Sequence, residues 1–298
     1  MLRTLARGVA LAVAGGLAGH ASLTPAHASG LQPAPRPSWD LRGRTAVVTG
    51  GSKGLGRAIV EELLAQGCDV LTCARDTSPL DALLQEQPAS LCAVCADVST
   101  SEGRQALLAA MRERWGEEAA LDILVNNVGT NLRKPSVEYT DEEYEMLHAT
   151  NQASAFHLSR ACFDALRRGE RKGCVINVSS VSGSTVDNTG AVYHMTKAAL
   201  EHMTRYLAVE WGPEGVRVNA VAPWFINTPL TAPLLSDEHF HGAVRRATPM
   251  RRVGEPHEVA CVVAFLAMPA AGYVTGQVVG IDGAMPSEGF RYVKAGGE

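Results

Sequence analysis

The sequence has few of the features that mark membrane, nucleic-acid-binding or disulfide-stabilised proteins. Its formal net charge of −4 argues against a basic face for nucleic acid. No apolar run is long enough to cross a bilayer. The seven cysteines are scattered and odd in number, unlike the paired framework of a small secreted domain. With 298 residues, of which 46% are hydrophobic and 19% charged, the chain can form one large soluble α/β domain.

Acidic residues and lysine are missing from residues 1–39, where the charges are Arg3, Arg7 and Arg36. This composition is typical of a cleavable organelle-targeting peptide. The apolar run 9–14 also resembles a secretory or lumen-type signal with a small-residue cleavage site downstream. An unprocessed, disordered extension is the third interpretation. We therefore expect a targeting peptide or extension over 1–39 and a single folded domain over 40–298.

After residue 40 the pattern alternates between short apolar strands and longer helical stretches. Such alternation predicts an α/β fold, a doubly wound Rossmann-type parallel sheet of about seven strands with helices on both faces. Ligands of such sheets bind at the carboxyl ends of the strands. The expected strands include 45–49, 69–73, 91–95, 121–126, 175–178 and 216–221, and the expected helices include 78–87, 100–115, 141–168 and 190–212.

A glycine-rich turn, with Gly50, Gly54 and Gly56, lies between the first strand and the first helix. Glycine lets the main chain approach a pyrophosphate, whose charge the helix N-terminus stabilises. The spacing differs from the commoner Gly-x-Gly-x-x-Gly, and a plain tight turn is the alternative. The strand before the turn and the helix after it favour a dinucleotide site.

The end of the second strand indicates which dinucleotide would bind. NAD sites usually have an acid there, but this chain has Ala74 followed by Arg75. Arg75, together with Lys53 in the glycine turn, can hold a 2′-phosphate. Asp76 is an acid close to this strand end and argues weakly for NAD, although an Asp that faces solvent is the favoured interpretation. Each cation alone is also compatible with an ordinary surface charge. The pattern favours NADP(H).

Three polar residues have both a functional and a structural interpretation. Asp97 follows the third strand, where it could bond the adenine amino group or simply form a turn or cap. Asn127 ends the fourth strand, where it could tie strands together beside the cofactor. Asn151 lies mid-helix, where Asn is unfavourable; a buried amide there needs partners, and a surface Asn is the alternative.

Tyr193 and Lys197 are four residues apart on an expected helix and so share one face. An ammonium beside a phenol favours the phenolate and lowers the pKa of the tyrosine. A chance surface pair has the same spacing. Ser180 ends the fifth strand, 13 residues before Tyr193, and would meet both side chains at the carboxyl edge of the sheet.

Together these motifs resemble the short-chain dehydrogenase/reductase superfamily over about residues 39–290. Within it, the segments 126–135, 221–226 and 248–256 are most similar to the tropinone reductase-like group of plants and algae. The ordered set is specific, although each motif alone is common. It comprises Thr49 to Gly56, Asn126-Asn127-Val128-Gly129, Asn151, Ser180, Tyr193-x-x-x-Lys197 and Asn219 to Pro223.

The resemblance implies a role for each catalytic residue. Tyr193 is the general acid of carbonyl reduction, Ser180 polarises the carbonyl, and Lys197 bonds the nicotinamide ribose and lowers the pKa of Tyr193. Asn151 holds a water that links Lys197 to solvent. The implied cofactor contacts are Gly50, Ser52, Lys53, Gly54, Leu55, Gly56, Arg75, Asp97, Val98, Asn127, Gly129, Tyr193, Lys197, Pro223, Ile226 and Thr228.

The expected substrate is a small, largely apolar ketone or its alcohol, because residues 229–246 could form an apolar lid; a helix packed on the core or on a neighbouring subunit is the alternative. The positive charge of Arg133 would repel a protonated amine such as tropinone, which argues against tropinone as the substrate. A 3-oxoacyl thioester is an alternative substrate, for which Arg133, Lys134, Arg245 and Arg246 are candidate contacts. A catalytically idle NADP(H)-binding sensor or scaffold is the rival from another class.

Other features carry smaller expectations. Cys92 and Cys95 have no nearby His or second Cys pair, so core packing is favoured over a metal site. Val128, Trp224 and Ala284 depart from the commoner family residues, and we expect little effect from Ala284. The resemblance implies a homodimer or homotetramer. An enzyme that uses a soluble nicotinamide cofactor fits import into a plastid or, second, a mitochondrion; a cytoplasmic location is the alternative.

Overall fold

The computed structural model of the protein describes residues 37–287. The expected targeting peptide therefore lies outside the described residues, apart from 37–39. Ser38 and Trp39 already contact the rest of the fold. The carbonyl oxygen of Ser38 accepts a hydrogen bond from the Ala270 amide at 3.0 Å, and the Trp39 ring stacks on Phe265 with centroids 5.6 Å apart. These two residues are thus part of the folded unit, which begins at Pro37.

A seven-stranded sheet with the order β3-β2-β1-β4-β5-β6-β7 forms the centre of the fold, and every pairing is parallel. The predicted doubly wound parallel sheet is confirmed. The strand order reverses between β1 and β4, which is the point where such sheets bind ligands. The strands are β1 Thr45–Thr49, β2 Asp69–Ala74, β3 Leu91–Cys95, β4 Ile123–Asn126, β5 Cys174–Val178, β6 Arg217–Pro223 and β7 Val278–Ile281.

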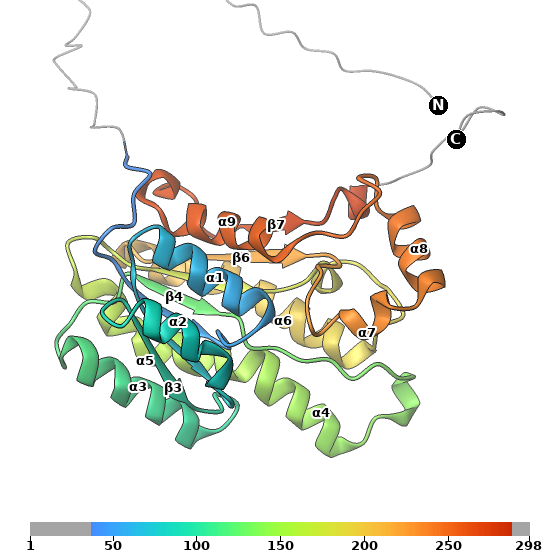
Figure 1. The fold of residues 1–298 in the computed structure, drawn as a ribbon, viewed down its shortest axis with the longest axis horizontal. Coiled ribbons are helices and arrows are strands. Elements are labelled where there is room, and N and C mark those ends of the chain that lie inside the picture. The colour runs from blue at the N-terminus through green and yellow to red at the C-terminus, as the bar shows by residue number, and fades with distance from the viewer. Residues whose placement is uncertain (1–36, 288–298) are drawn as a thin grey trace, which may run out of the picture. The chain divides into compact units, whose positions relative to one another are not determined.

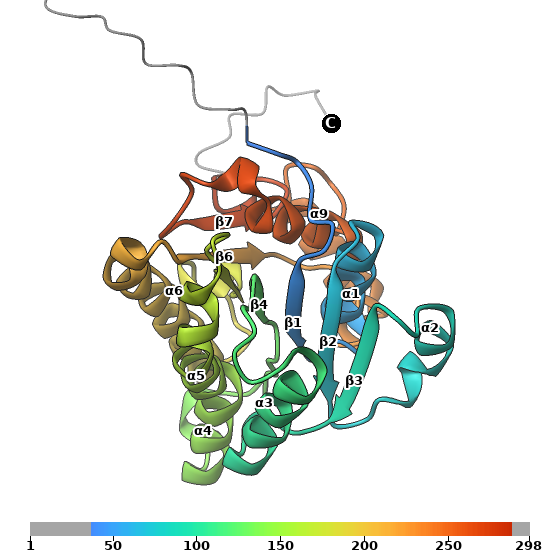
Figure 2. The same ribbon diagram turned by 90° about the vertical axis from the view of Figure 1, so that its left-hand side faces the viewer.

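Helices cover both faces of the sheet, with α1 and α9 on one side and α3, α5 and α6 on the other (Figure 2). Both faces must be covered because the strands are apolar on both. The helices are α1 Gly54–Ala65, α2 Asp81–Glu86, α3 Ser101–Trp115, α4 Asp141–His148, α5 Ser154–Arg168, α6 Ala191–Trp211, α7 Ala232–Leu235, α8 Glu238–Ala247 and α9 Pro256–Ala267. Within residues 37–287, no helix combines the length and apolar character that a membrane span requires.

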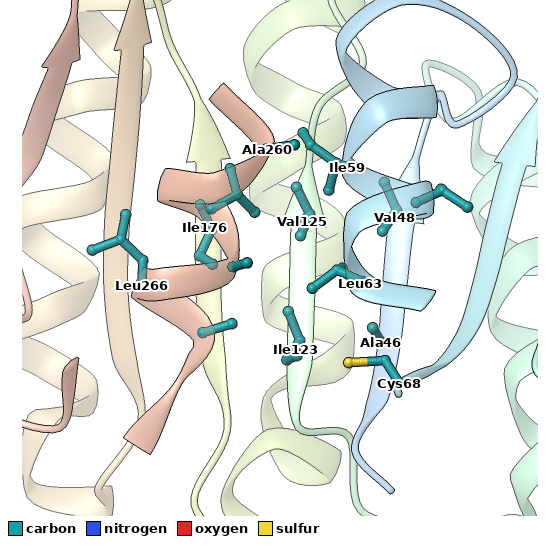
Figure 3. Packing of buried hydrophobic residues seen from close by; sticks show 14 of the residues in the cluster. Ala46, Val48, Ile59, Leu63, Cys68, Ile123, Val125, Ile176, Ala260 and Leu266 are labelled. Atoms are coloured by element: carbon teal, nitrogen blue, oxygen red, sulfur yellow. The ribbon is translucent and has the colours of Figure 1, made fainter. Parts of the chain in front are cut away.

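The packing of α1 and α9 fixes the position of the glycine turn. Ile59 and Leu63 of α1 and Ala260 of α9 are buried against Val48 of β1 and Val125 of β4 (Figure 3). Each large apolar side chain that is fully buried there contributes about 1.5–3 kcal/mol. A second apolar cluster, with Leu124, Val175, Leu158 and Leu207 among its members, packs the other face. The N-terminus of α1 is therefore held at the carboxyl end of β1.

The helix that the sequence predicts over 141–168 is interrupted. A π-helical turn, Ala149–Ala153, separates α4 from α5, and Asn151 lies in this turn. Single π turns within α-helices occur most often at functional sites. Periodicity could not predict the turn because the apolar pattern continues across it.

Candidate active site

The glycine turn closes tightly on itself at the end of β1. Gly50 and Gly54 have φ angles of +72° and +59°, and a Cβ atom at Gly56 would collide with the Gly50 carbonyl oxygen. Asn127 holds the turn from the neighbouring strand, because its side-chain amide donates to the Thr49 carbonyl at 2.8 Å. The bare main chain before the α1 N-terminus suits a bound phosphate.

The segment after β6 forms the facing wall of this turn. A Cβ atom at Gly54 would lie 3.7 Å from the Cβ of Thr228, so the two residues are close neighbours. Pro223 ends β6, and Ile226 is buried and pairs through its main chain with Gly254. Ser52 within the turn is buried as well, and Leu55 follows at the start of α1. The structure thus brings the predicted contacts from both segments together.

Two cations lie beside the end of β2. Arg75 and Lys53 are both exposed, and neither side chain forms a hydrogen bond or ion pair with another residue in 37–287. Asp76 is engaged elsewhere, since its Oδ1 accepts the Ser78 amide at 3.0 Å and the Ser78 hydroxyl at 2.7 Å. These hydrogen bonds, aided by the charge of Lys53, lower the pKa of Asp76. Both cations are therefore free for an anion.

Asp97 forms a turn after β3. Its Oδ1 accepts the Ser99 amide at 3.0 Å and the Ser99 hydroxyl at 2.7 Å. Burial opposes ionisation, but the Ser99 hydrogen bonds and the charge of Arg75 hold the pKa of Asp97 below its usual value. The cap of α3 is Thr100, so Asp97 is a turn residue and not a helix cap. The next residue, Val98, is buried; contacts of either with adenine stay predictions.

Lys197 and Asn151 converge on Gly129 at the carboxyl edge of the sheet, and Tyr193 lies next to Lys197. A Cβ atom at Gly129 would lie 3.3 Å from the Lys197 Nζ and 3.6 Å from the Asn151 Oδ1. The Lys197 Nζ donates to the Val178 carbonyl at 2.8 Å and lies 5.5 Å from the centroid of the Tyr193 ring. Ser180 follows β5, and its hydroxyl lies close enough to the Tyr193 hydroxyl to lower the pKa of that phenol. All four predicted catalytic residues thus share one site.

The side-chain amide of Asn151 is buried and fully engaged. Its Oδ1 accepts the Thr130 amide at 2.8 Å, and its Nδ2 donates to the Thr130 carbonyl at 2.9 Å and the Thr196 hydroxyl at 3.1 Å. With 1% of its surface exposed, Asn151 is not the surface residue that the sequence left as an alternative. It joins the loop after β4 to α6.

The electrostatics of the pair differ from the expectation. Burial raises the pKa of Tyr193, opposed by the hydrogen bond to Ser180 and the charge of Arg133, whereas Lys197 is not among the groups that act on it. The ammonium lies over the ring face and is directed at Val178, so it does not flank the hydroxyl. Burial lowers the pKa of Lys197 to about 8, and the charge of Glu201 opposes this.

Comparison with known proteins identifies the family. A family model described as enoyl-(acyl carrier protein) reductase matches residues 50–285. A tropinone reductase homolog of Arabidopsis thaliana is 45% identical over 260 residues, which cover 85% of this chain and 96% of the relative. The chain belongs to the short-chain dehydrogenase/reductase family. Another relative from the same plant, a tropinone reductase homolog named as chloroplastic, is 44% identical over 85% of this chain and 78% of its own length.

Solved structures of other short-chain dehydrogenases/reductases have the same fold. A putative gluconate dehydrogenase from Agrobacterium tumefaciens is 33% identical with a TM-score of 0.79, over 84% of this chain and 98% of that one. A gluconate 5-dehydrogenase from Burkholderia cenocepacia, in complex with NADP and tartrate, is 28% identical with a TM-score of 0.78 over the same shares. The protein is therefore an oxidoreductase of this family, similar to the tropinone reductase homologs.

The expected lid consists of α7 and α8, which lie beyond the carboxyl end of β6 (Figure 1). Aromatic contacts anchor α8 to the strand end: the Phe225 ring lies 4.7 Å from that of Trp224 and 5.4 Å from that of Phe240. Val244 of α8 is buried, whereas Leu230 is 48% exposed. Anchored core packing therefore explains α8, and a lid function stays a prediction for the segment before it.

The four basic candidates for an acyl carrier do not form one free patch. Lys134 is paired with Glu143, and the Nε of Arg245 donates to the Arg251 carbonyl at 3.1 Å. Arg245 lines a separate cavity of about 590 Å³ that none of the predicted catalytic or cofactor residues lines. The cavity is bordered by His241, Arg245, Arg251, Arg252, Val253, Glu255, His257 and Glu258.

Several residues of the site were not predicted from the sequence. Thr196 holds the amide of Asn151, the Val178 carbonyl orients Lys197, and Ser179 and Glu201 form a buried pair next to them. A main-chain partner such as the Val178 carbonyl cannot be predicted from sequence, because every residue has a carbonyl group. Glu201, however, lies four residues after Lys197, and this spacing is the same as that which linked Tyr193 to Lys197.

Proposed function

We propose that this protein is an NADP(H)-dependent oxidoreductase that interconverts a small, largely apolar ketone and its secondary alcohol. The observation that carries this proposal is the convergence of Tyr193, Ser180 and Lys197 beside the glycine turn. A phenol, a hydroxyl and an ammonium at the carboxyl edge of a doubly wound sheet form a site for carbonyl reduction.

The residues present fit an NADP(H) cofactor. The turn from Gly50 to Gly56 would receive the pyrophosphate, because side chains there would block the approach. Arg75 and Lys53 would hold the 2′-phosphate, since both are unpaired among residues 37–287 and Asp76 is engaged with Ser78. When bound, the cofactor supplies the hydride for reduction or accepts it in the reverse direction.

The chain itself supplies the proton and stabilises the oxygen. Burial keeps Tyr193 a phenol at neutral pH, so its hydroxyl can give a proton to the carbonyl oxygen as the carbon is reduced. The Ser180 hydroxyl donates a hydrogen bond to the same oxygen and offsets its growing negative charge. The Lys197 ammonium lies over the Tyr193 ring and not beside its hydroxyl, so its proposed part is to relay the proton that converts the phenolate back to the phenol.

We further propose that Asn151 participates in reprotonation. Its amide fixes the π turn against Thr130 and Thr196, and this turn would hold a water between Lys197 and solvent. Proton transfer through that water would restore the phenol for the next turnover. Contacts of Asp97 and Val98 with adenine, and of Ile226 and Thr228 with the nicotinamide amide, belong to the same proposal.

We also propose that the protein forms a homo-oligomer and is imported into a plastid. Exposed apolar side chains on α5 and α6, namely Phe156 (38%), Tyr206 (65%) and Val209 (81%), support a homodimer or homotetramer formed through these helices. A chloroplastic relative and the acid-free first 39 residues support import into a plastid.

The decisive experiment is NADPH oxidation with a ketone panel. The panel contains cyclic monoterpenoid ketones, tropinone and 3-oxoacyl thioesters, each tested with NADPH and NADH. We expect turnover of apolar ketones with NADPH and poor turnover of tropinone, because the cation Arg133 acts at the Tyr193 hydroxyl. Preference for the thioesters would show that the substrate is a 3-oxoacyl chain and not a small ketone. Tight NADPH binding without turnover of any carbonyl would favour a sensor or scaffold.

A further inference from the structure

Glu201 is a buried carboxylate one helical turn beyond Lys197 on α6. Only 2% of its surface is exposed, and the i,i+4 spacing puts both side chains on the same face of the helix. Acidic residues are almost never this buried unless a partner offsets the loss of hydration. The proposed reaction uses Lys197 but leaves Glu201 without a role.

The surroundings of Glu201 link it to the catalytic serine. Its Oε1 accepts the Ser179 hydroxyl at 3.1 Å, and Ser179 immediately precedes Ser180. The Ser179 Oγ also lies 3.4 Å from the Lys197 carbonyl oxygen, within the same network. A Cβ atom at Gly183 would collide with the carboxylate, so the turn that follows Ser180 closes directly on Glu201.

The charged groups around this network are few. Arg205, half exposed on α6, has its guanidinium 3.7 Å from the Glu201 Oε2, and Lys197 is the other cation that acts on the carboxylate. Arg133 and Asp187, from the loops that face the helix, act on Tyr193 and not on Glu201. Asn151 and Thr196, which pack on the Lys197 side, are neutral. Among residues 37–287, Glu201 is thus the one carboxylate whose charge acts on the buried Lys197 ammonium.

We propose that Glu201 is a positioning residue that acts as the counter-ion of Lys197 and holds the Ser179–Ser180 segment against α6. The proposal rests on the proposed function, because it explains how Lys197 stays charged in a buried site at neutral pH. Burial lowers the pKa of Lys197 to about 8, and Glu201 is the charge that opposes a further decrease. Burial likewise raises the pKa of Glu201, while Ser179, Arg205 and Lys197 oppose the rise.

Two substitutions separate charge from hydrogen bonding. Glu201→Gln removes the charge but retains an oxygen that can accept the Ser179 hydroxyl. Ser179→Ala removes that hydrogen bond but leaves the carboxylate. If Glu201 had only a structural role, both substitutions would change the titration midpoint of Lys197 similarly. If Glu201 is the counter-ion, only the loss of its charge changes that midpoint. Glu201→Met is a second neutral variant of similar volume, and it removes the charge and the carboxylate acceptor of the Ser179 hydrogen bond together.

The titration of Lys197 can be measured directly, without substrate. The chain has only five lysines, at positions 53, 134, 172, 197 and 294. NMR of the full-length protein labelled with [ε-¹³C]lysine therefore gives five signals, and Lys197→Arg identifies the relevant one. We expect the Lys197 midpoint to decrease by roughly one pH unit or more in Glu201→Gln and Glu201→Met, because the opposite charge that acts on Lys197 is lost.

The controls decide the outcome. Circular dichroism establishes that each variant folds, and Ser179→Ala and Glu201→Asp should keep the midpoint within a few tenths of the wild-type value. An unchanged midpoint in the neutral variants, or an equal decrease in Ser179→Ala, overturns the proposal. With an accepted ketone, the alkaline limb of kcat/KM should move by the same amount. If wild type reduces no ketone, the proposed function fails while the NMR titration still tests Glu201.

Discussion

The Lys197 ammonium donates to the carbonyl oxygen of Val178 at 2.8 Å, two residues before Ser180. This hydrogen bond ties α6 to the end of β5, the strand that carries the proposed oxyanion donor. Lys197 is thus oriented by the main chain before any cofactor binds. Because Tyr193 lies one turn earlier on the same helix, its position relative to Ser180 depends on the same anchor.

Replacing Tyr193 by Phe tests its role as the proton donor. The ring and its packing remain, but no group can protonate the carbonyl oxygen, so kcat should decrease by about 1000-fold. The affinity for NADPH, measured by fluorescence titration, should remain nearly unchanged. A parallel loss of NADPH affinity and turnover would count against proton donation.

Replacing Arg75 by Ala tests the choice of nucleotide. A charge-assisted hydrogen bond to the 2′-phosphate would be lost, which should weaken NADPH by about 10- to 100-fold and leave NADH nearly unaffected. Arg171, an exposed arginine in the loop before β5 at the opposite edge of the sheet, provides the matched Ala control. Equal weakening of both nucleotides would refute the 2′-phosphate assignment.

The pH dependence of reduction follows from Lys197. Its pKa of about 8 means that the ammonium is present below this pH and lost above it. Because Lys197 is proposed to relay the proton that restores the Tyr193 phenol, kcat/KM for ketone reduction should be level near neutrality and decrease above about pH 8. Alcohol oxidation should respond oppositely, since its proton leaves through a deprotonated Lys197. A reduction profile that is flat to pH 10 would exclude Lys197 as the proton relay.

Much of the fold could be predicted because it depends on local patterns. The alternation of apolar strands and helices gave the parallel sheet, and the strand ends gave one common edge for Asn127, Ser180 and Tyr193. The family that the ordered motifs suggested is confirmed by the matching family model and by the relatives. The π turn around Asn151 was not predictable, because it depends on a tertiary contact with Thr130 that leaves no periodic signal.

The pKa shifts in the site were harder to predict than the residues that form it. The spacing of four residues predicted that Lys197 lies beside Tyr193. It could not predict which atoms the flexible lysine side chain contacts. In the structure the ammonium is directed at Val178, and burial dominates the pKa of Tyr193. Extending the same i,i+4 rule by one turn would have reached Glu201 from the sequence.

Replacing Asn151 by Ala should weaken both the fold and catalysis. Three hydrogen bonds of the amide are lost, and Thr130 and Thr196 are left with unpaired groups, which should cost about 2–4 kcal/mol. Urea denaturation measures this loss, and kcat should decrease with it. Thr196→Val removes only one of the partners and should cost less. A stability equal to wild type would show that water replaces the amide.

Ala284, in the turn after β7, has a φ angle of +69°, a left-handed conformation that is strained for a residue with a Cβ atom. Ala284→Gly should therefore increase the free energy of unfolding by up to about 1 kcal/mol, part of the gain being offset by the greater freedom of glycine in the unfolded chain. The neighbouring Gly283 provides the reverse substitution, because its φ angle of +59° is also left-handed. A Cβ atom at Gly283 would lie only 2.6 Å from the Thr248 Cγ2. Gly283→Ala should destabilise the protein by more than Ala284→Gly stabilises it. Thermal unfolding of both variants measures the two effects, and a decrease of Tm in Ala284→Gly would show that the strain at this turn is negligible.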